Sequence, residues 1–82
     1  MTIQAATIQR DTTGRREANL RMSREELAGA WFAHIHRQSD DRVARSTVAV
    51  RARDLGMTQR DLARLAHRGG LMSDAELVGY LG

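Results

Sequence analysis

The chain has 82 residues, with 13 basic and 10 acidic side chains and a formal net charge of +3. This length allows one small domain, and the absence of cysteine excludes disulfides and thiolate metal sites as sources of its stability. Association of copies is the remaining common source, so we expect a homo-oligomer, most simply a homodimer. The sequence has neither an apolar run of the roughly 20 residues that a membrane span needs nor a signal-peptide core, which predicts a soluble cytoplasmic protein.

The composition favours helices over strands, because the chain has no proline, single Trp, Tyr and Phe residues, and many Ala and Leu residues. We predict an all-α fold, a small bundle of three to four short helices covering about residues 23–38, 41–55, 59–68 and 74–81. These lie in one domain, residues 22–82, which follows a flexible N-terminal tail, residues 1–21.

Residues 1–21 are rich in Thr, Gln and Arg and show no sustained helical or strand period. One interpretation is a disordered terminus without a role. A second is an arm that folds on a partner or lies along a phosphate backbone, with Arg10, Arg15, Arg16 and Arg21 as contacts. A third is that residues 2–8 pair as a strand with the sheet edge of a partner.

The first predicted helix opens with a capping box between Ser23 and Glu26. Its apolar face is broad and consists of Leu27, Ala28, Trp31, Phe32 and Ile35, which predicts that it supplies most of the core. His34 and His36 are two positions apart and point about 200° from each other on a helix, so they cannot hold one metal ion together.

The second predicted helix covers residues 41–55. The stretch Ser39-Asp40-Asp41 ends the first helix and can cap the second. Its apolar stripe is formed by Ala44, Val48, Ala52 and Leu55. Within it, residues 47–53 also alternate as a strand would, but the folded part of the chain offers no second strand to pair with them.

Residues that commonly begin and end helices flank the third predicted helix. Gly56 can adopt the left-handed conformation that ends the preceding helix, and Thr58 with Asp61 forms a capping box. Residues 69–70, Gly-Gly, end the helix. Its polar face carries Gln59, Arg60, Arg64 and Arg68, a basic and amide-bearing surface beside a helix N-terminus, which suits phosphate.

The wording of residues 56–66, Gly-Met-Thr-Gln-Arg-Asp-Leu-Ala-Arg-Leu-Ala, resembles the first helix of the helix-turn-helix in the Cro/CI-type repressor family. The resemblance implies a helical DNA-binding regulator with Gln59 at the backbone of its operator. The chain departs from the family after this helix. A polar recognition helix would follow there, whereas residues 73–76, Ser-Asp-Ala-Glu, are acidic, so the resemblance does not assign residues that read bases.

Chemistry for catalysis is not indicated. The sequence shows no metal-ligand cluster, phosphate-binding glycine loop or histidine with an acid partner at motif spacing, so we predict neither an enzyme nor a metal or cofactor. All basic residues are arginine, a residue suited to phosphate and guanine, although GC-rich codon usage produces the same bias.

Two functions remain. The first is a small DNA-binding transcriptional regulator whose candidate contacts are Gln59, Arg60, Arg64, Arg68, Arg51 and Arg53. The second is an adaptor or inhibitor that docks on a larger protein through an apolar helix face, with the candidate interface residues Trp31, Phe32, Leu77 and Tyr80. Alignment of the arginines on one exposed face would favour DNA, and a large exposed apolar patch would favour a protein partner.

Overall fold

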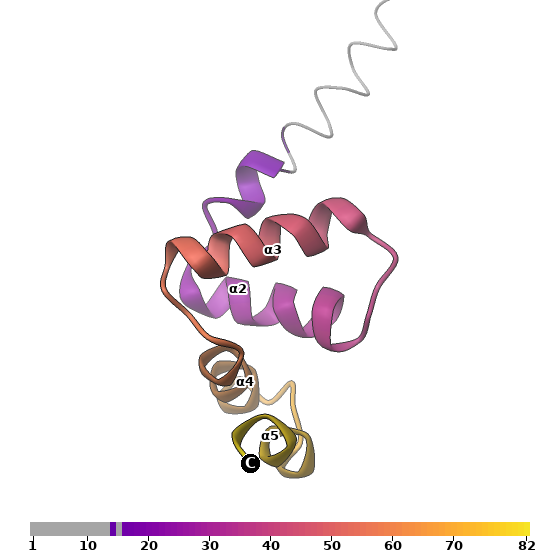
Figure 1. Cartoon of the computed structure of the whole chain (residues 1–82), viewed down its shortest axis with the longest axis vertical. Helices are drawn as coiled ribbons and strands as arrows, with labels where there is room; N and C mark the ends of the chain where they lie inside the picture. The colour runs from indigo at the N-terminus through magenta and orange to yellow at the C-terminus, as the bar shows by residue number, and fades with distance from the viewer. Residues whose placement is uncertain (1–13, 15) are drawn as a thin grey trace, which may run out of the picture.

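The computed structural model describes residue 14 and residues 16–82, and this part of the chain is helical with no strand. The elements are α2 (Arg24–Trp31), the π-helix η1 (Phe32–His36), α3 (Arg42–Asp54), α4 (Gln59–Arg68) and α5 (Asp74–Leu81) (Figure 1). The predicted all-α fold is confirmed. The strand alternative for residues 47–53 is wrong, because these residues lie inside α3.

Each of the α-helices α2 to α5 begins at a side-chain cap. In α2, α4 and α5 the cap hydroxyl accepts the N–H of the third helical residue, whose carboxylate accepts the N–H of the cap in return. The three pairs are Ser23 with Glu26, Thr58 with Asp61, and Ser73 with Glu76. Helix α3 is capped by Asp41, which accepts the N–H of Ala44. These caps explain why the predicted helix starts agree closely with the structure.

The first predicted helix, residues 23–38, is not one continuous α-helix. After Trp31 the chain widens into η1, in which the N–H of Arg37 bonds to the carbonyl of Phe32, five residues earlier. Gln38 then takes a positive φ of 53° and ends the helical path. The rings of Phe32 and His36 stack at 5.1 Å between centroids. The π turn therefore sets the position from which His36 reaches the last helix.

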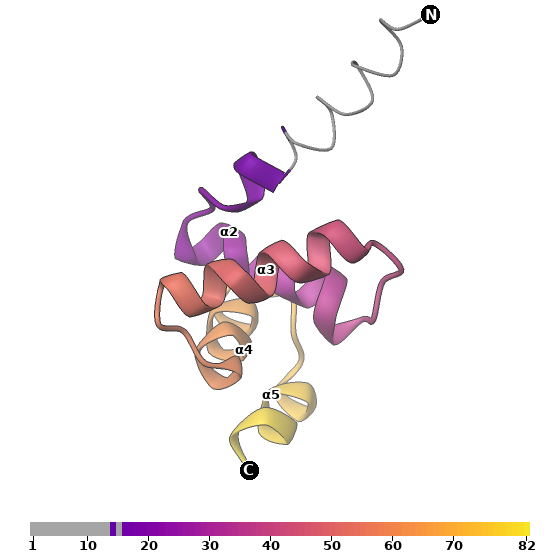
Figure 2. The ribbon, with the colours of Figure 1, turned by 45° about the horizontal axis from the view of Figure 1, so that its top comes forward.

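The core is built around α2. Helices α2 and α3 run side by side, and α4 and α5 cross them steeply on one side (Figures 1 and 2). All four helical segments from α2 to α4 contribute to the buried cluster, and Met72 joins it from the segment before α5. Its members are Leu27, Ala28, Trp31, Phe32, Val48, Leu62, Ala63, Ala66 and Met72.

The end of the predicted N-terminal tail is held against α3. Residues 16–19 are helical, and the side-chain amide of Asn19 donates to the Thr47 hydroxyl at 3.0 Å. At Met22, the first residue of the predicted domain, the main-chain carbonyl accepts from Nε of Arg51 at 2.9 Å. Residues 1–13 and 15, which include Arg10, Arg15 and the strand alternative for residues 2–8, lie outside the described residues.

Candidate nucleic-acid interface

Helices α3 and α4 form a pair joined by the short segment 55–58. Gly56 in this segment has a φ of 65°, and the N–H of Met57 returns to the carbonyl of Ala52, which closes the end of α3. Thr58 then caps α4, whose axis is turned steeply from that of α3 (Figure 1). The segment is thus a helix, a short glycine-containing turn and a second helix, and the second helix packs chiefly on α2 and α5.

The outer face of α4 is basic. Leu62, Ala63 and Ala66 are buried, whereas Gln59, Arg60, Arg64 and Arg68 are all exposed. The three arginines recur at every fourth position, so they follow one stripe along the helix. Within the described part of the chain, no hydrogen bond or ion pair occupies these three guanidinium groups. Arg60 and Arg68 are therefore free to meet an external anion, whereas the charge of Arg64 also lies close enough to Asp61 to lower its pKa.

The two predicted contacts in α3 differ in their surroundings. Arg53 is exposed in the last turn of α3, near the turn that leads to α4. Arg51 is half-buried, and its Nε donates to the Met22 carbonyl. The structure thus brings Arg53 to the same end of the molecule as the start of α4, whereas Arg51 holds the N-terminal segment against α3.

The N-terminus of α4 is already occupied by a carboxylate. The side chain of Asp61 accepts the main-chain N–H of Thr58 at 2.9 Å, and this bond, with that to the Thr58 hydroxyl and the nearby charge of Arg64, lowers the Asp61 pKa below its usual value. Asp61 is therefore ionised at neutral pH. The arginine stripe, rather than the helix terminus itself, offers the better position for phosphate.

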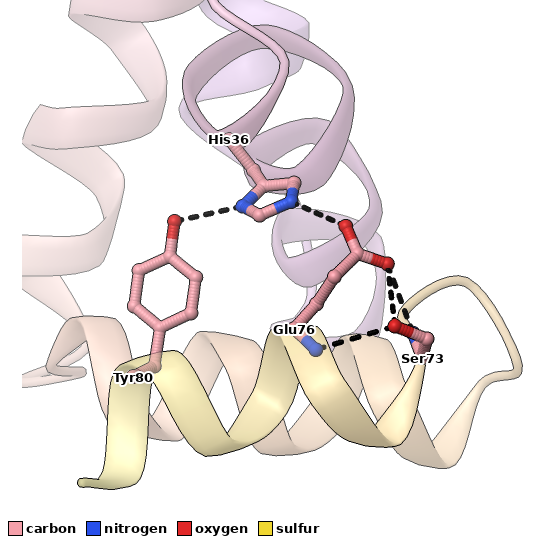
Figure 3. A network of polar contacts seen from close by, with 4 residues as sticks. All are labelled: His36, Ser73, Glu76 and Tyr80. Atoms are coloured by element: carbon pink, nitrogen blue, oxygen red, sulfur yellow. Dashed lines mark hydrogen bonds and ion pairs between the residues drawn. The ribbon is translucent and has the colours of Figure 1, made fainter.

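A polar network that the sequence did not indicate fixes α5 to η1 (Figure 3). Nε2 of His36 lies 2.7 Å from Oε2 of Glu76, and Nδ1 of the same ring lies 2.8 Å from the Tyr80 hydroxyl. Hydrogen bonding to Ser73, and then to His36, lowers the Glu76 pKa to about 2. Both ring nitrogens of His36 are therefore engaged by side chains of α5.

Helix α5 is unsuited to face phosphate. It carries Asp74 and Glu76 and has no basic residue in its last turn. Asp74 is highly exposed and lies against Nε2 of His67 at the end of α4. Among the residues described here, no group of three potential His or carboxylate ligands could hold a metal ion.

The aromatic residues expected to anchor a protein partner are not on the surface. Trp31 is 1% and Phe32 6% exposed, and both belong to the core. Tyr80 packs edge-on against Trp31 at 5.1 Å between centroids and is, like Leu77, half-buried. The prediction that Trp31 and Phe32 anchor a partner is therefore corrected. Both are core residues, and their burial between the helices keeps a partner from contacting them.

Exposed large apolar side chains occur at three separate places in the described chain. Val50 lies on α3, Leu71 in the segment between α4 and α5, and Val78 on α5. They are therefore distributed over different elements. The arginine stripe of α4, in contrast, lies on one face of one helix.

Comparisons with models of protein families, with curated proteins and with solved structures gave no match to this chain. None of the described helices combines the length and apolar character needed to cross a membrane.

Proposed function

We propose that the protein binds duplex DNA through the α3–turn–α4 pair, with α4 lying in the major groove. The observation that carries the proposal is the exposed, unpaired stripe of Arg60, Arg64 and Arg68 on the outer face of α4. In a helix-turn-helix the second helix enters the major groove, and the first crosses the backbone. The order α3, short turn, α4 fits these two roles.

This arrangement places α4 second in the pair, whereas the sequence resemblance placed it first. The geometry supports the second position because α3 precedes α4 through a short turn, while the following helix, α5, is acidic and tied to η1. A negatively charged helix that is fixed in this way is poorly suited to bind in a DNA groove, which is lined by phosphates. In this proposal α4 itself is the recognition helix, which the sequence resemblance had not identified.

The N-terminal residues of α4 are the candidates for reading bases. Residues at this position of a recognition helix meet base edges, and the amide of Gln59 suits adenine while the guanidinium of Arg60 suits guanine. Arg53, exposed near the end of α3, is a candidate for the flanking phosphates. Arg64 and Arg68, farther along α4, extend the phosphate contacts.

The second candidate function, docking on another protein, is favoured by a separate observation. Two shallow hollows between α2 and α4 have an apolar floor that includes Leu65 and Leu71. They lie beside the arginine stripe and do not include Gln59 or Arg60. Arg64 and Arg68 of the stripe line these hollows, so a partner protein bound there would compete with DNA for these two side chains.

The experiment that tests DNA binding is a titration of a labelled duplex library at two salt concentrations. We expect tight binding to a subset of sequences and a steep loss of affinity with salt, because each neutralised phosphate contributes about 0.9 to the slope of log affinity against log salt. Arg60→Ala with Arg64→Ala should weaken binding. The matched control is Arg42→Ala, which removes an exposed arginine from the start of α3. Weak binding that is equal for all duplexes would refute the proposal.

A homodimer is the simplest assembly for such a reader. Two copies related by a two-fold axis would read half-sites about one helical turn apart. Sedimentation of the free protein and of its complex with a selected duplex tests this. A one-to-one complex on the shortest fully bound duplex would exclude the dimeric arrangement.

A further inference from the structure

A shallow groove follows the contact between α2 and α4. It consists of two adjoining hollows that share the side chains of Leu65 and Arg68. The first hollow adds Leu55 and Met57 to the floor with Arg24 and Arg64 at the edge, and the second continues to Leu71. We call this feature the α2–α4 groove. Along α4 its lining runs from Asp61 to Arg68, about 12 Å at 1.5 Å per residue, a length that suits a short helical segment.

The groove combines an apolar floor with a cationic edge. Leu71 is 48% exposed although it is a large aliphatic side chain, so its contact surface is largely uncovered. Arg24, Arg64 and Arg68 are exposed at the edge and make no hydrogen bond or ion pair with the described residues. The acidic side chains on the same edge are Asp61, which is committed to the cap of α4, and Glu25.

We propose that the α2–α4 groove binds an acidic amphipathic peptide segment of a partner protein. Apolar side chains of the segment would contact Leu65 and Leu71, while its carboxylates would pair with Arg24 and Arg68. Charge complementarity selects an acidic occupant, and the apolar floor selects an amphipathic one. The proposal goes beyond DNA binding, because it assigns a peptide ligand to the groove. Gln59 and Arg60 lie outside the groove, whereas Arg64 and Arg68 belong to both surfaces.

The floor argues for a peptide rather than for nucleic acid. Surfaces that contact DNA are polar and strongly positive, and a phosphate backbone offers nothing apolar to cover Leu65 and Leu71. A helical peptide presents apolar side chains on one face and acidic ones along its borders, which matches the groove in both respects. Arg64 and Arg68 belong both to the arginine stripe and to the groove edge, so a peptide and a duplex would compete for these two side chains.

The test uses a fluorescein-labelled synthetic peptide in which Leu residues at i, i+3, i+4 and i+7 form one face and Glu residues border it. Binding to the full chain is followed by fluorescence anisotropy. Two control peptides replace every Glu by Gln or every Leu by Ser. We expect the labelled peptide to bind saturably and both control peptides to bind at least roughly tenfold more weakly, the change expected when one strong contact is lost.

Variants of the protein locate the site. Arg68→Glu and Leu71→Ser should each weaken peptide binding roughly tenfold, whereas the exposed control positions on α3, Arg42→Glu and Val50→Ser, should leave it unchanged. Circular dichroism and melting establish that each variant is folded. If Leu71→Ser melts at a lower temperature than the parent, Arg24→Glu provides a second edge variant, because it adds a favourable charge to the first turn of α2.

Three results would overturn the proposal. The first is absence of saturable binding, or binding that Leu71→Ser and the edge variants leave unchanged. The second is an edge variant that weakens duplex binding without affecting the peptide, which would assign the groove arginines to phosphate. The third is a dimer of the free chain that Leu71→Ser abolishes, which would make a second copy the occupant. Because Arg60 lies outside the groove, Arg60→Ala can abolish DNA binding without changing peptide binding, so each of the two proposals can be refuted independently of the other.

Discussion

The Glu76 carboxylate lies 2.7 Å from Nε2 of His36, although the two residues are 40 positions apart in the chain. No residue of α5 is fully buried, so α5 is held by this contact, by the Tyr80 hydroxyl on the other ring nitrogen, and by half-buried apolar contacts such as that of Leu77. The docking of the last helix therefore combines these polar contacts with partly buried apolar contacts to the core.

The Tyr80 hydroxyl should contribute measurably to stability. Tyr80→Phe removes the partner of Nδ1 of His36 and leaves the ring against Trp31. We expect the free energy of unfolding to fall by about 0.5–1.5 kcal/mol, the usual net value of such a hydrogen bond. Urea unfolding measures the change. Equal stability of Tyr80→Phe and the parent chain would show that the bond does not hold α5.

Stability should decline on acidification because of Glu76. Its pKa is lowered from 4.5 to about 2 in the folded chain, chiefly by hydrogen bonding to Ser73 and then to His36. Between these two values the unfolded state binds more protons, so the contribution is complete above pH 4.5 and is lost as the pH falls through about 2.

The measurement is thermal unfolding from pH 7 down to pH 2. Glu76→Gln should be less stable than the parent at neutral pH and should lose less on acidification. The control is Glu25→Gln, which changes an exposed residue of α2 that takes no part in the capping box. A parallel acid decline in the parent and in Glu76→Gln would contradict this role of Glu76.

Most of the fold was predictable because the chain marks its helix ends locally. The predicted bounds 59–68 and 74–81 coincide with α4 and α5, since Thr58 and Ser73 cap them and Gly69 ends the first. The π turn was not predictable. Phe32 and His36 fit an ordinary helical pattern, and the widened turn depends on contacts with other elements that local periodicity does not record.

The candidate site was predictable only in part. The exposed positions of Arg60, Arg64 and Arg68 followed from the helical period of α4, with its buried face at Leu62 and Ala66. The engagement of Arg51 with Met22 and the contact between His36 and Glu76 did not, because each joins residues that lie far apart in the chain. Sequence patterns identify the face of a side chain but not its partner on another element.

Gly56 and Gly69 both follow helices, and substitution by alanine should destabilise the protein more at Gly56 than at Gly69. Its φ is 65°, so Gly56→Ala forces a side chain into the left-handed region at a cost of about 1–2 kcal/mol. Gly69→Ala is the matched control, because a Cβ there meets the Leu65 carbonyl at an ordinary 3.5 Å and its φ is −78°. Chemical denaturation compares the two. A larger loss at Gly69 than at Gly56 would refute this explanation of the α3–α4 turn.

The cap of α4 should be replaceable by serine but not by alanine. Thr58→Ala removes the hydroxyl that accepts the Asp61 N–H, and we expect a loss of about 1 kcal/mol in unfolding free energy. Thr58→Ser keeps that acceptor and should stay close to the parent. The same pair of substitutions can be compared by melting. If the alanine and serine variants melt together, the capping box does not stabilise α4.

The most direct test of DNA binding compares Arg60, which we propose contacts DNA, with Arg51, which bonds to the Met22 carbonyl. On a selected duplex, Arg60→Ala should weaken binding and reduce the salt slope by about 1, with unchanged melting, if Arg60 contacts a phosphate; a base contact would instead relax sequence preference. Arg51→Gln should lower the unfolding free energy by about 1 kcal/mol through loss of the bond to Met22, with the salt slope unchanged. The contrary result is an Arg60→Ala variant that binds every duplex as the parent does, which would remove α4 from the DNA interface.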